Sequence, residues 1–139
     1  MKTFGNDGKV YIINLEKNSI NEDCEKKSSL HKDAKNLIKK CLPYCTVYEE
    51  VILTGCNGVG GRPLRVDFLI PDIRVIIEVN GKQHYEHVKH FHKSKSNFDI
   101  YKKNDEIKTD WAEINNITLI ELPYNEKKNW EKIINGKIG

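Results

Sequence analysis

Two acidic residues, Asp67 and Glu78, stand within two strongly apolar segments of this sequence, LRVDFLI (64–70) and RVIIEVN (74–80). Both segments alternate as β-strands do, and residues 71–73 between them predict a turn. In an antiparallel hairpin with this turn, Asp67 lies directly opposite Glu78, because the pairs 67/78 and 71/74 have the same index sum. Opposite residues share a face of the sheet, with Cβ atoms about 4.5–5.5 Å apart.

Two carboxylates at this separation repel each other unless a cation lies between them. Mg²⁺ meets this need, because proteins typically hold it with one or two carboxylates plus substrate phosphates. The alternative is that both acids are solvated on the exposed face of an edge hairpin. Leu69 and Ile76 share their face and argue against full solvation. The pattern therefore predicts a metal site at Asp67 and Glu78, with Asn80 on the same face.

The residues that follow the second strand are polar and suited to hydrolysis. The chain continues as EVNGKQHYEH from Glu78, and Gly81 permits a sharp exit from the strand. Lys82, Gln83 and His84 are thereby placed beside the predicted metal. Hydrolysis of a phosphate ester needs a water nucleophile, a proton acceptor and a cation for the developing charge. His84 or Lys82 can supply the last two.

The net charge of +3 is concentrated in one segment. Residues 80–109 contain seven Lys and four acidic residues, a balance of +3, and four of the five His. Such a segment suggests a polyanionic partner, although a solvated helix face has the same composition. Zinc is the less favoured interpretation of the four His, since no Cys lies nearby. Candidate DNA contacts, which would neutralise phosphates, are Arg62, Arg65, Lys82, Lys89, Lys93, Lys95, Lys102 and Lys103.

The elements around these residues are predicted from periodicity and breakers. Residues 4–15 indicate a turn and a short strand, and 16–27 a polar linker. A helix capped by Ser28 or Ser29 runs to about Cys41, followed by a strand at 46–53 and a flexible glycine-rich loop at 55–62. After the hairpin come a helix at 97–114, a strand at 117–122 and a short helix around Trp130. This order predicts a single α/β domain with a mixed sheet between helices.

Composition narrows the class of protein. Hydrophobic residues make up 38% and charged residues 31% of the 139 positions, as in a polar globular protein. No stretch approaches about 18 uncharged apolar residues, and the N-terminus has no apolar signal segment, so we expect neither membrane insertion nor secretion. The four Cys contain no CxxC pair, which favours reduced thiols in a cytoplasmic protein.

The pattern Asp67-x10-Glu78-x-Asn80, on two strands behind one helix and ahead of a second helix and strand, resembles the PD-(D/E)xK nuclease superfamily. The segments RVDFLIPDIRVIIEVNGKQHY, FDIYKKNDEIK and ITLIELPY are more narrowly similar to phage-type endonucleases related to homing and very-short-patch-repair enzymes. The resemblance spans about residues 28–124. It implies a restriction-endonuclease-like nuclease core there, with 1–27 as N-terminal strand and linker and 125–139 as C-terminal helix or tail.

The resemblance also implies roles for individual residues. Asp67 and Glu78 would hold Mg²⁺, for which Mn²⁺ is a potential substitute, helped by the backbone carbonyl of Val79. Asn80 stands where the superfamily's name has Lys, and a neutral amide cannot stabilise charge as an ammonium does. That role would pass to a residue of the 82–84 segment, among them His84.

Two further residues are candidates through the same resemblance. In the repair-like branch a His just beyond the strand acts in catalysis, and His84 matches that position. An acid of the following helix can orient such a His, and Asp105 is the candidate. The first helix often contributes an acid to the site, and in this sequence that helix offers His31 and Asp33.

The sequence thus predicts a Mg²⁺-dependent DNA endonuclease of phage or mobile-element type, acting in the cytoplasm of a bacterial or phage-infected cell. One alternative is a structure-specific or repair nuclease, which reads a junction or a mismatch. Another is a DNA-binding module that has kept the fold and lost cleavage. Asn80 favours this last alternative, whereas Asp67, Glu78 and His84 oppose it. A homodimer is left open.

Overall fold

The strands of the central sheet coincide with the apolar segments of the sequence. The structure is a computed structural model that describes residues 1–17, 28–81 and 95–138. Its four-stranded sheet has the order β3–β4–β5–β6, formed by Tyr48–Asn57, Pro63–Ile70, Val75–Asn80 and Thr118–Pro123. The first two pairings are antiparallel and the pairing of β5 with β6 is parallel. The predicted α/β fold with a mixed sheet is confirmed.

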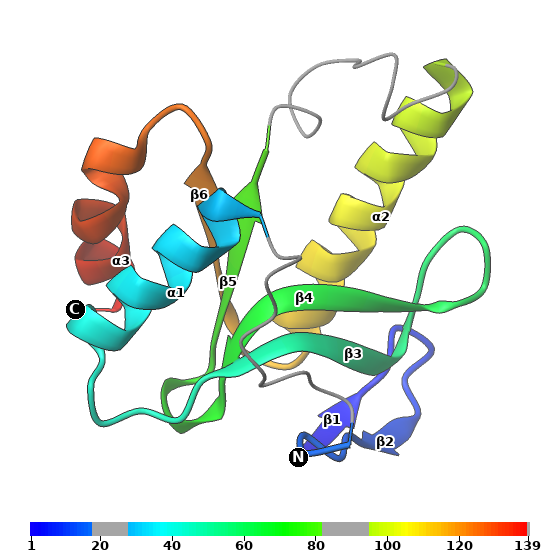
Figure 1. The fold of residues 1–139 in the computed structure, drawn as a ribbon. Helices are drawn as coiled ribbons and strands as arrows, with labels where there is room; N and C mark the ends of the chain where they lie inside the picture. Colours follow the sequence, from blue (N-terminus) through cyan, green and yellow to red (C-terminus); the bar gives the residue numbers. More distant parts are fainter. Residues whose placement is uncertain (18–27, 82–94, 139) are drawn as a thin grey trace.

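Helices cover both faces of this sheet (Figure 1). The helices α1 (Ser29–Cys41) and α3 (Trp130–Ile138) lie on one side, and α2 (Lys95–Ile114) lies on the other. The hydroxyl of Ser28 accepts the backbone N–H of His31, so Ser28 is the N-cap predicted for α1. Short 3₁₀ turns occupy Pro71–Ile73 and Lys127–Asn129.

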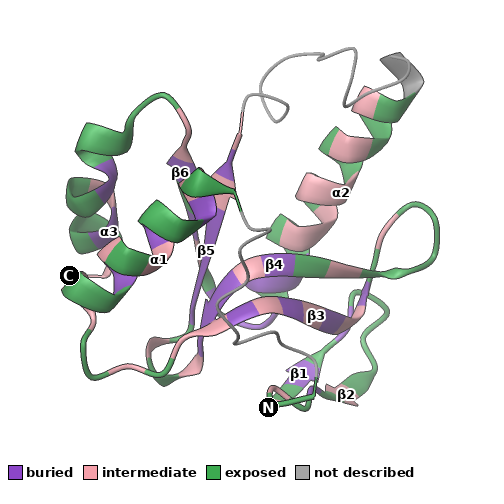
Figure 2. Ribbon diagram, viewed as in Figure 1, coloured by how far each residue is buried: buried purple, intermediate pink, exposed green. Residues whose placement is uncertain are grey.

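Each face of the sheet has its own apolar cluster, and the buried residues follow the strands and the inner sides of the helices (Figure 2). On β5, Ile76 belongs to the cluster that contains Trp111 of α2, and Ile77 to the cluster on the α1 side. The alternation predicted for β4 is wrong in one place, since Val66 packs in the cluster of Leu69 rather than that of Phe68. On the partner strand β3, Glu50 lies between the residues paired with Phe68 and Val66 and has a φ of +47°, so the backbone departs from the extended conformation there.

The N-terminal segment forms a hairpin where the sequence predicted one strand. The strands β1 (Lys2–Phe4) and β2 (Val10–Ile12) pair antiparallel. Asn115, at the end of α2, holds this hairpin: its side-chain oxygen accepts the Phe4 N–H at 2.8 Å, and its Nδ2 donates to the Phe4 carbonyl at 2.9 Å. A strand of three residues is too short for a periodic signal, so the sequence did not indicate β1.

The glycine-rich loop between β3 and β4 is tied to α2, although its composition predicted a flexible loop. The N–H of Val59 donates to Asn104 Oδ1 at 2.9 Å, and the N–H of Gly58 donates to the Arg62 carbonyl at 2.9 Å. A Cβ on Gly58 would lie 2.7 Å from Asn104 Oδ1, so a glycine permits this close approach. The hairpin of β3 and β4 is therefore longer than predicted: β3 extends to Asn57, whereas the sequence predicted a strand that ends at residue 53.

Two observations bear on the expected class of protein. No helix within the described ranges 1–17, 28–81 and 95–138 is long and apolar enough to cross a membrane. Cys41, Cys45 and Cys56 are free thiols, and Cys24 lies outside the described residues.

Removal of the Asn115 side chain should destabilise the fold. Asn115→Ala removes two hydrogen bonds to the backbone of Phe4, each worth about 0.5–1.5 kcal/mol, or about 1–3 kcal/mol together. We expect a loss of that size in the free energy of unfolding, measured by urea denaturation. The exposed Asn129 provides the control: Asn129→Ala should change the value by less than about 0.5 kcal/mol. Equal effects of the two substitutions would contradict the bridging role of Asn115.

Candidate active site

The register of β4 and β5 brings Asp67 beside Glu78, as the sequence predicted. The observed pairs, Phe68 with Ile77 and Leu69 with Ile76, have the index sum from which that prediction was made. The regular backbone pairing of β4 with β5 ends at Phe68 and Ile77. Beyond that pair, the two strands are joined by hydrogen bonds from backbone N–H groups to side chains. The N–H of Asp67 donates to Glu78 Oε2 at 3.3 Å, and the N–H of Val79 donates to Asp67 Oδ2 at 2.8 Å. The two carboxylates therefore lie together where the strands separate.

A lysine that the sequence analysis did not select completes this group. Lys108 of α2 places its Nζ 2.8 Å from Glu78 Oε1, and the side chains are 16% and 10% exposed, respectively. The sequence held a signal for this position. Ile107 and Trp111 belong to the apolar stripe of the predicted helix, and Lys108 lies beside them, next to Ile107 and three positions before Trp111. A lysine beside such a stripe faces the sheet rather than solvent.

The electrostatics of the site favour an added positive charge. Burial, the charge of Glu78 and a hydrogen bond with Glu78 together raise the pKa of Asp67 to about 8, against the lowering effect of the Val79 N–H and of Lys108. Burial alone would lower the pKa of Lys108, but the neighbouring acids, Glu78 foremost, raise it above its ordinary value. Lys108 therefore stays charged, and its single charge does not compensate both carboxylates.

The donor set at this position fits Mg²⁺. Asp67 and Glu78 offer carboxylate oxygens, and the N–H of Val79 faces Asp67. The N–H and C=O of one strand residue point to the same edge, so the Val79 carbonyl faces that edge too. Within the part of the chain that the structure describes, no three His, Cys, Asp or Glu side chains form a ligand group. Two carboxylates, a carbonyl and water suit Mg²⁺, which keeps several waters, whereas structural zinc needs more protein ligands.

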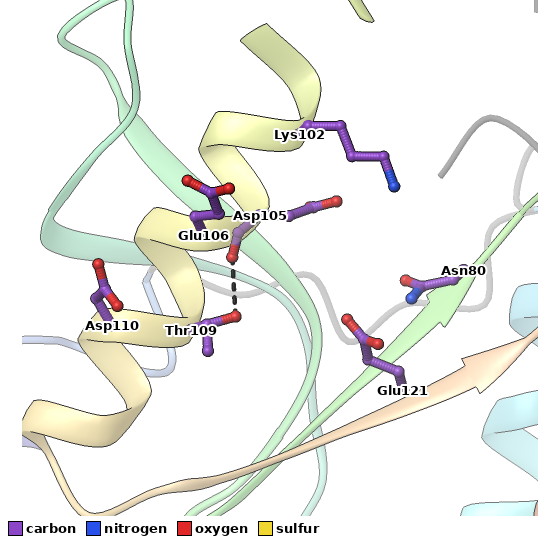
Figure 3. Close-up of a pocket in the computed structure, with 7 residues that line it drawn as sticks. All are labelled: Asn80, Lys102, Asp105, Glu106, Thr109, Asp110 and Glu121. Atoms are coloured by element: carbon purple, nitrogen blue, oxygen red, sulfur yellow. Dashed lines mark hydrogen bonds between the residues drawn. The ribbon is translucent and has the colours of Figure 1, made fainter. Parts of the chain in front are cut away.

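A cleft of about 310 Å³ lies beside the carboxylate pair, between α2 and the ends of β5 and β6 (Figure 3). Three of the predicted residues, Asn80, Asp105 and Lys102, line this cleft. Among the described residues, four that the sequence analysis did not select also line it: Glu106, Thr109, Asp110 and Glu121. The structure thus brings Asn80 and Asp105 to one cavity.

His31 belongs to a different group. Its Nε2 lies 3.0 Å from Glu49 Oε1, and its ring stacks on Phe68 with a centroid distance of 4.5 Å. Glu49 is 3% exposed and also forms an ion pair with Lys35. Phe68 packs in the cluster on the α1 side, whereas Glu78 contacts α2. The contacts of His31 therefore tie it to a buried network on the α1 side of the sheet.

The structure describes only some of the residues that the sequence predicted as DNA contacts. Four of them are exposed: Arg62 and Arg65 on the β3–β4 hairpin, and Lys102 and Lys103 on α2. The Nζ of Lys102 lies 5.6 Å from the centroid of the Phe98 ring. Lys95 begins α2, but its side chain is not described. The other predicted DNA contacts, Lys82, Lys89 and Lys93, lie outside the described part of the chain. The catalytic candidates Gln83 and His84 lie outside it too, as do the other three His considered for zinc.

Two viral proteins are similar to part of this chain. Over 76 residues, or 55% of the chain, it is 41% identical to uncharacterized protein 307L of Invertebrate iridescent virus 6. Over 71 residues, or 51%, it is 37% identical to uncharacterized protein 033L of Invertebrate iridescent virus 3. The chain spans less than two fifths of these relatives, 38% and 37% of their lengths. No protein-family model and no solved structure matches the chain.

The raised pKa of Asp67 predicts that the free energy of unfolding depends on pH. Between the ordinary pKa of 3.8 and about 8, the folded protein retains a proton that the unfolded chain releases. Its stability without metal should therefore fall across this window as the pH rises. We expect Asp67→Asn, measured in EDTA, to be more stable than the wild type by a margin that grows from about pH 4 to about pH 8.

Two further measurements check this expectation. Asp99→Asn, a change at an exposed position of α2, should show no such growing margin. If the pair holds Mg²⁺, saturating Mg²⁺ should remove the advantage of Asp67→Asn, because a bound ion would stabilise the ionised carboxylates of the wild type. A margin that is independent of pH would mean that Asp67 ionises as it does in the unfolded chain.

Proposed function

We propose that this protein is a Mg²⁺-dependent DNA endonuclease. The observation that carries the proposal is the group of Asp67, Glu78 and Lys108. The Glu78 carboxylate accepts the N–H of Asp67 from the adjacent strand, and an ammonium lies 2.8 Å from its other oxygen. The resemblance to PD-(D/E)xK nucleases lacked the lysine, since Asn80 occupies its position. Lys108 supplies an ammonium from α2 instead, which weakens the argument for a module that has lost cleavage.

Each residue of this group has a role in phosphodiester hydrolysis. Asp67, Glu78 and the Val79 carbonyl would hold Mg²⁺, which when bound supplies an acidified water and neutralises phosphate charge. Lys108 fixes the orientation of Glu78 through its 2.8 Å contact. Its partly buried ammonium also offsets the negative charge that develops on the phosphate, in a setting where charges are weakly screened. His84 retains the proton-transfer role that the resemblance implies.

The surface around the site supports a nucleic-acid substrate. Arg62, Arg65, Lys102 and Lys103 are exposed on two elements that contact each other through Val59 and Asn104. Positive side chains on the hairpin and on α2 can bind the phosphates of a duplex. A nuclease that recognises a junction or mismatch would use the same site. Incubation with supercoiled plasmid and with branched DNA, in Mg²⁺, Mn²⁺ or EDTA, distinguishes the two kinds of substrate.

Asp67→Asn and Glu78→Gln should each abolish Mg²⁺-dependent cleavage. Both changes preserve shape and remove a charged oxygen ligand, so the protein should stay folded and keep most of its DNA affinity. Plasmid nicking and a binding assay with labelled duplex in Ca²⁺ measure the two properties separately. Glu113→Gln, at an exposed position of α2, should cleave as the wild type does. Near-normal cleavage by either ligand variant would sink the proposed site.

Replacement of Lys108 should lower turnover without removing the metal ligands. Lys108→Met retains the apolar stem and deletes the charge, and we expect a loss of about 10²–10³-fold in kcat, typical of a lost electrostatic contact. Lys82→Ala is the comparison, since Lys82 was the sequence-based candidate for this role. A large loss in Lys82→Ala with normal turnover in Lys108→Met would return the role to the 82–84 segment. Lys103→Ala controls for loss of one exposed charge on α2.

His84→Ala should reduce turnover by about 10²–10⁴-fold, the usual contribution of general acid–base catalysis. The unperturbed pKa of His is about 6.5, which suits proton transfer near neutral pH. DNA affinity should change little, and the acidic limb of the pH–rate profile should change in the variant. His87→Ala is the matched control from the same segment. Full activity of His84→Ala would show that the repair-like mechanism does not apply.

A further inference from the structure

Arginine is rare in this chain and is concentrated on one hairpin. Three of the 23 basic residues are Arg, and two of them, Arg62 and Arg65, lie where the β3–β4 hairpin enters β4. The third, Arg74, donates to the carbonyls of Asn115 and Asn116 at the end of α2. Because the chain uses Lys for almost all of its positive charge, the two Arg of the hairpin indicate a need for the planar, five-donor guanidinium that Lys lacks.

Neither guanidinium of this hairpin is used inside the protein. The side chains of Arg62 and Arg65 are exposed, and no hydrogen bond or ion pair joins either of them to a residue of the ranges 1–17, 28–81 and 95–138. Residues 54–65 contain no acidic residue, so this end of the hairpin has a charge of +2. Two unpaired guanidinium groups on an uncompensated positive segment are suited to a polyanionic partner.

The end of the hairpin has a fixed shape and is open on its outer side. The N–H of Val59 donates to Asn104 of α2, and the N–H of Gly61 donates to the Gly58 carbonyl at 2.9 Å. A Cβ on Gly61 would meet no atom within 4 Å, so nothing in the structure covers the tip. Figure 1 shows the hairpin projecting from the body of the molecule. A partner therefore meets a pre-organised hairpin, which lowers the entropic cost of binding.

The exposed side chains of this end are of the types that read DNA bases. They are Asn57, Val59, Arg62 and Arg65. In the major groove, Arg donates two hydrogen bonds to guanine, Asn pairs with adenine, and an apolar side chain contacts the thymine methyl group. A two-stranded β-ribbon fits the major groove, which is about 12 Å wide, whereas the minor groove is only about 6 Å wide. Both the shape and the side chains of the hairpin thus favour the major groove.

We propose that the end of the β3–β4 hairpin, residues 57–65, enters the major groove of duplex DNA and reads its sequence. Arg62 and Arg65 each donate two hydrogen bonds to a guanine, and Asn57 and Val59 contact neighbouring bases. The inference rests on the proposed function for its substrate, duplex DNA. It adds that the substrate is selected by base sequence and not by a junction or a mismatch.

The distance along β4 sets where the bases that are read lie relative to the cut. Arg62 precedes Asp67 by five positions, and a strand rises about 3.4 Å per residue, so the two residues are at most about 17 Å apart along the strand. Successive nucleotides of a DNA strand are also about 3.4 Å apart along the helix axis. The bases that select the substrate should therefore lie within about five base pairs of the phosphate that is cut.

The experiment is selection of bound duplexes by the full chain, in Ca²⁺, from a library with a randomised central segment. The wild type should enrich a motif that contains guanine. Arg62→Lys and Arg65→Lys preserve the charge, so each should bind non-motif DNA as the wild type does and lose about 5- to 150-fold in preference at one guanine of the motif. Lys103→Ala is the control for a phosphate contact: it should weaken binding of all sequences alike and retain the motif.

The inference is overturned if the wild type enriches no motif, if it prefers junctions or mismatches to every matched duplex, or if both Arg→Lys variants retain the full motif. Mapping of cut sites in Mg²⁺ separates this result from the proposed function. Cleavage without a motif would support the nuclease and reject the reading hairpin. A motif that depends on Arg62 and Arg65, in a protein that cuts no DNA, would support the hairpin and reject the nuclease.

Discussion

The repulsion between Asp67 and Glu78 is the constraint around which the site is organised. The hairpin cannot avoid the contact, because a slip of one residue would turn the apolar side chains of β4 away from their clusters. The protein compensates locally. The N–H of Val79 binds Asp67, the N–H of Asp67 binds Glu78, and Lys108 places an ammonium on Glu78. These contacts leave a negative excess at the carboxylate pair, which raises the pKa of Asp67 and which the proposed Mg²⁺ would neutralise.

Helix α2 supplies that ammonium, and its position is fixed at several points along its length. Trp111 is fully buried against the sheet. Asn104 accepts the N–H of Val59 from the β3–β4 loop, and Asn115 holds both backbone groups of Phe4. Because these contacts hold the helix between the hairpin and the N-terminal strands, Lys108 is directed at Glu78 rather than left free to sample solvent. Asp105, Glu106 and Asp110 of the same helix line the cleft.

The sequence predicts the parts of this arrangement that depend on local periodicity. The alternation of β4 and β5 and the short turn between them sufficed for the pairing of Asp67 with Glu78. Lys108 could not be paired with Glu78 in the same way, since the contact joins a helix to a strand 30 positions away and depends on how α2 packs. The attachment of the Gly58 loop to α2 is a tertiary contact of the same kind, and glycine composition alone suggested flexibility there.

Asn80 connects the two features that distinguish this site. A lysine at position 80, as the superfamily pattern has it, would extend its ammonium into the cleft and neutralise Glu121 or Asp105. With asparagine at that position, the ammonium reaches Glu78 from Lys108 of α2 instead. A lysine on a helix can make this ion pair with Glu78, because its flexible four-carbon side chain reaches from the helix to the strand. With asparagine on the strand, the ammonium beside the carboxylate pair therefore depends on the packing of α2 and not on the sequence of the strand itself.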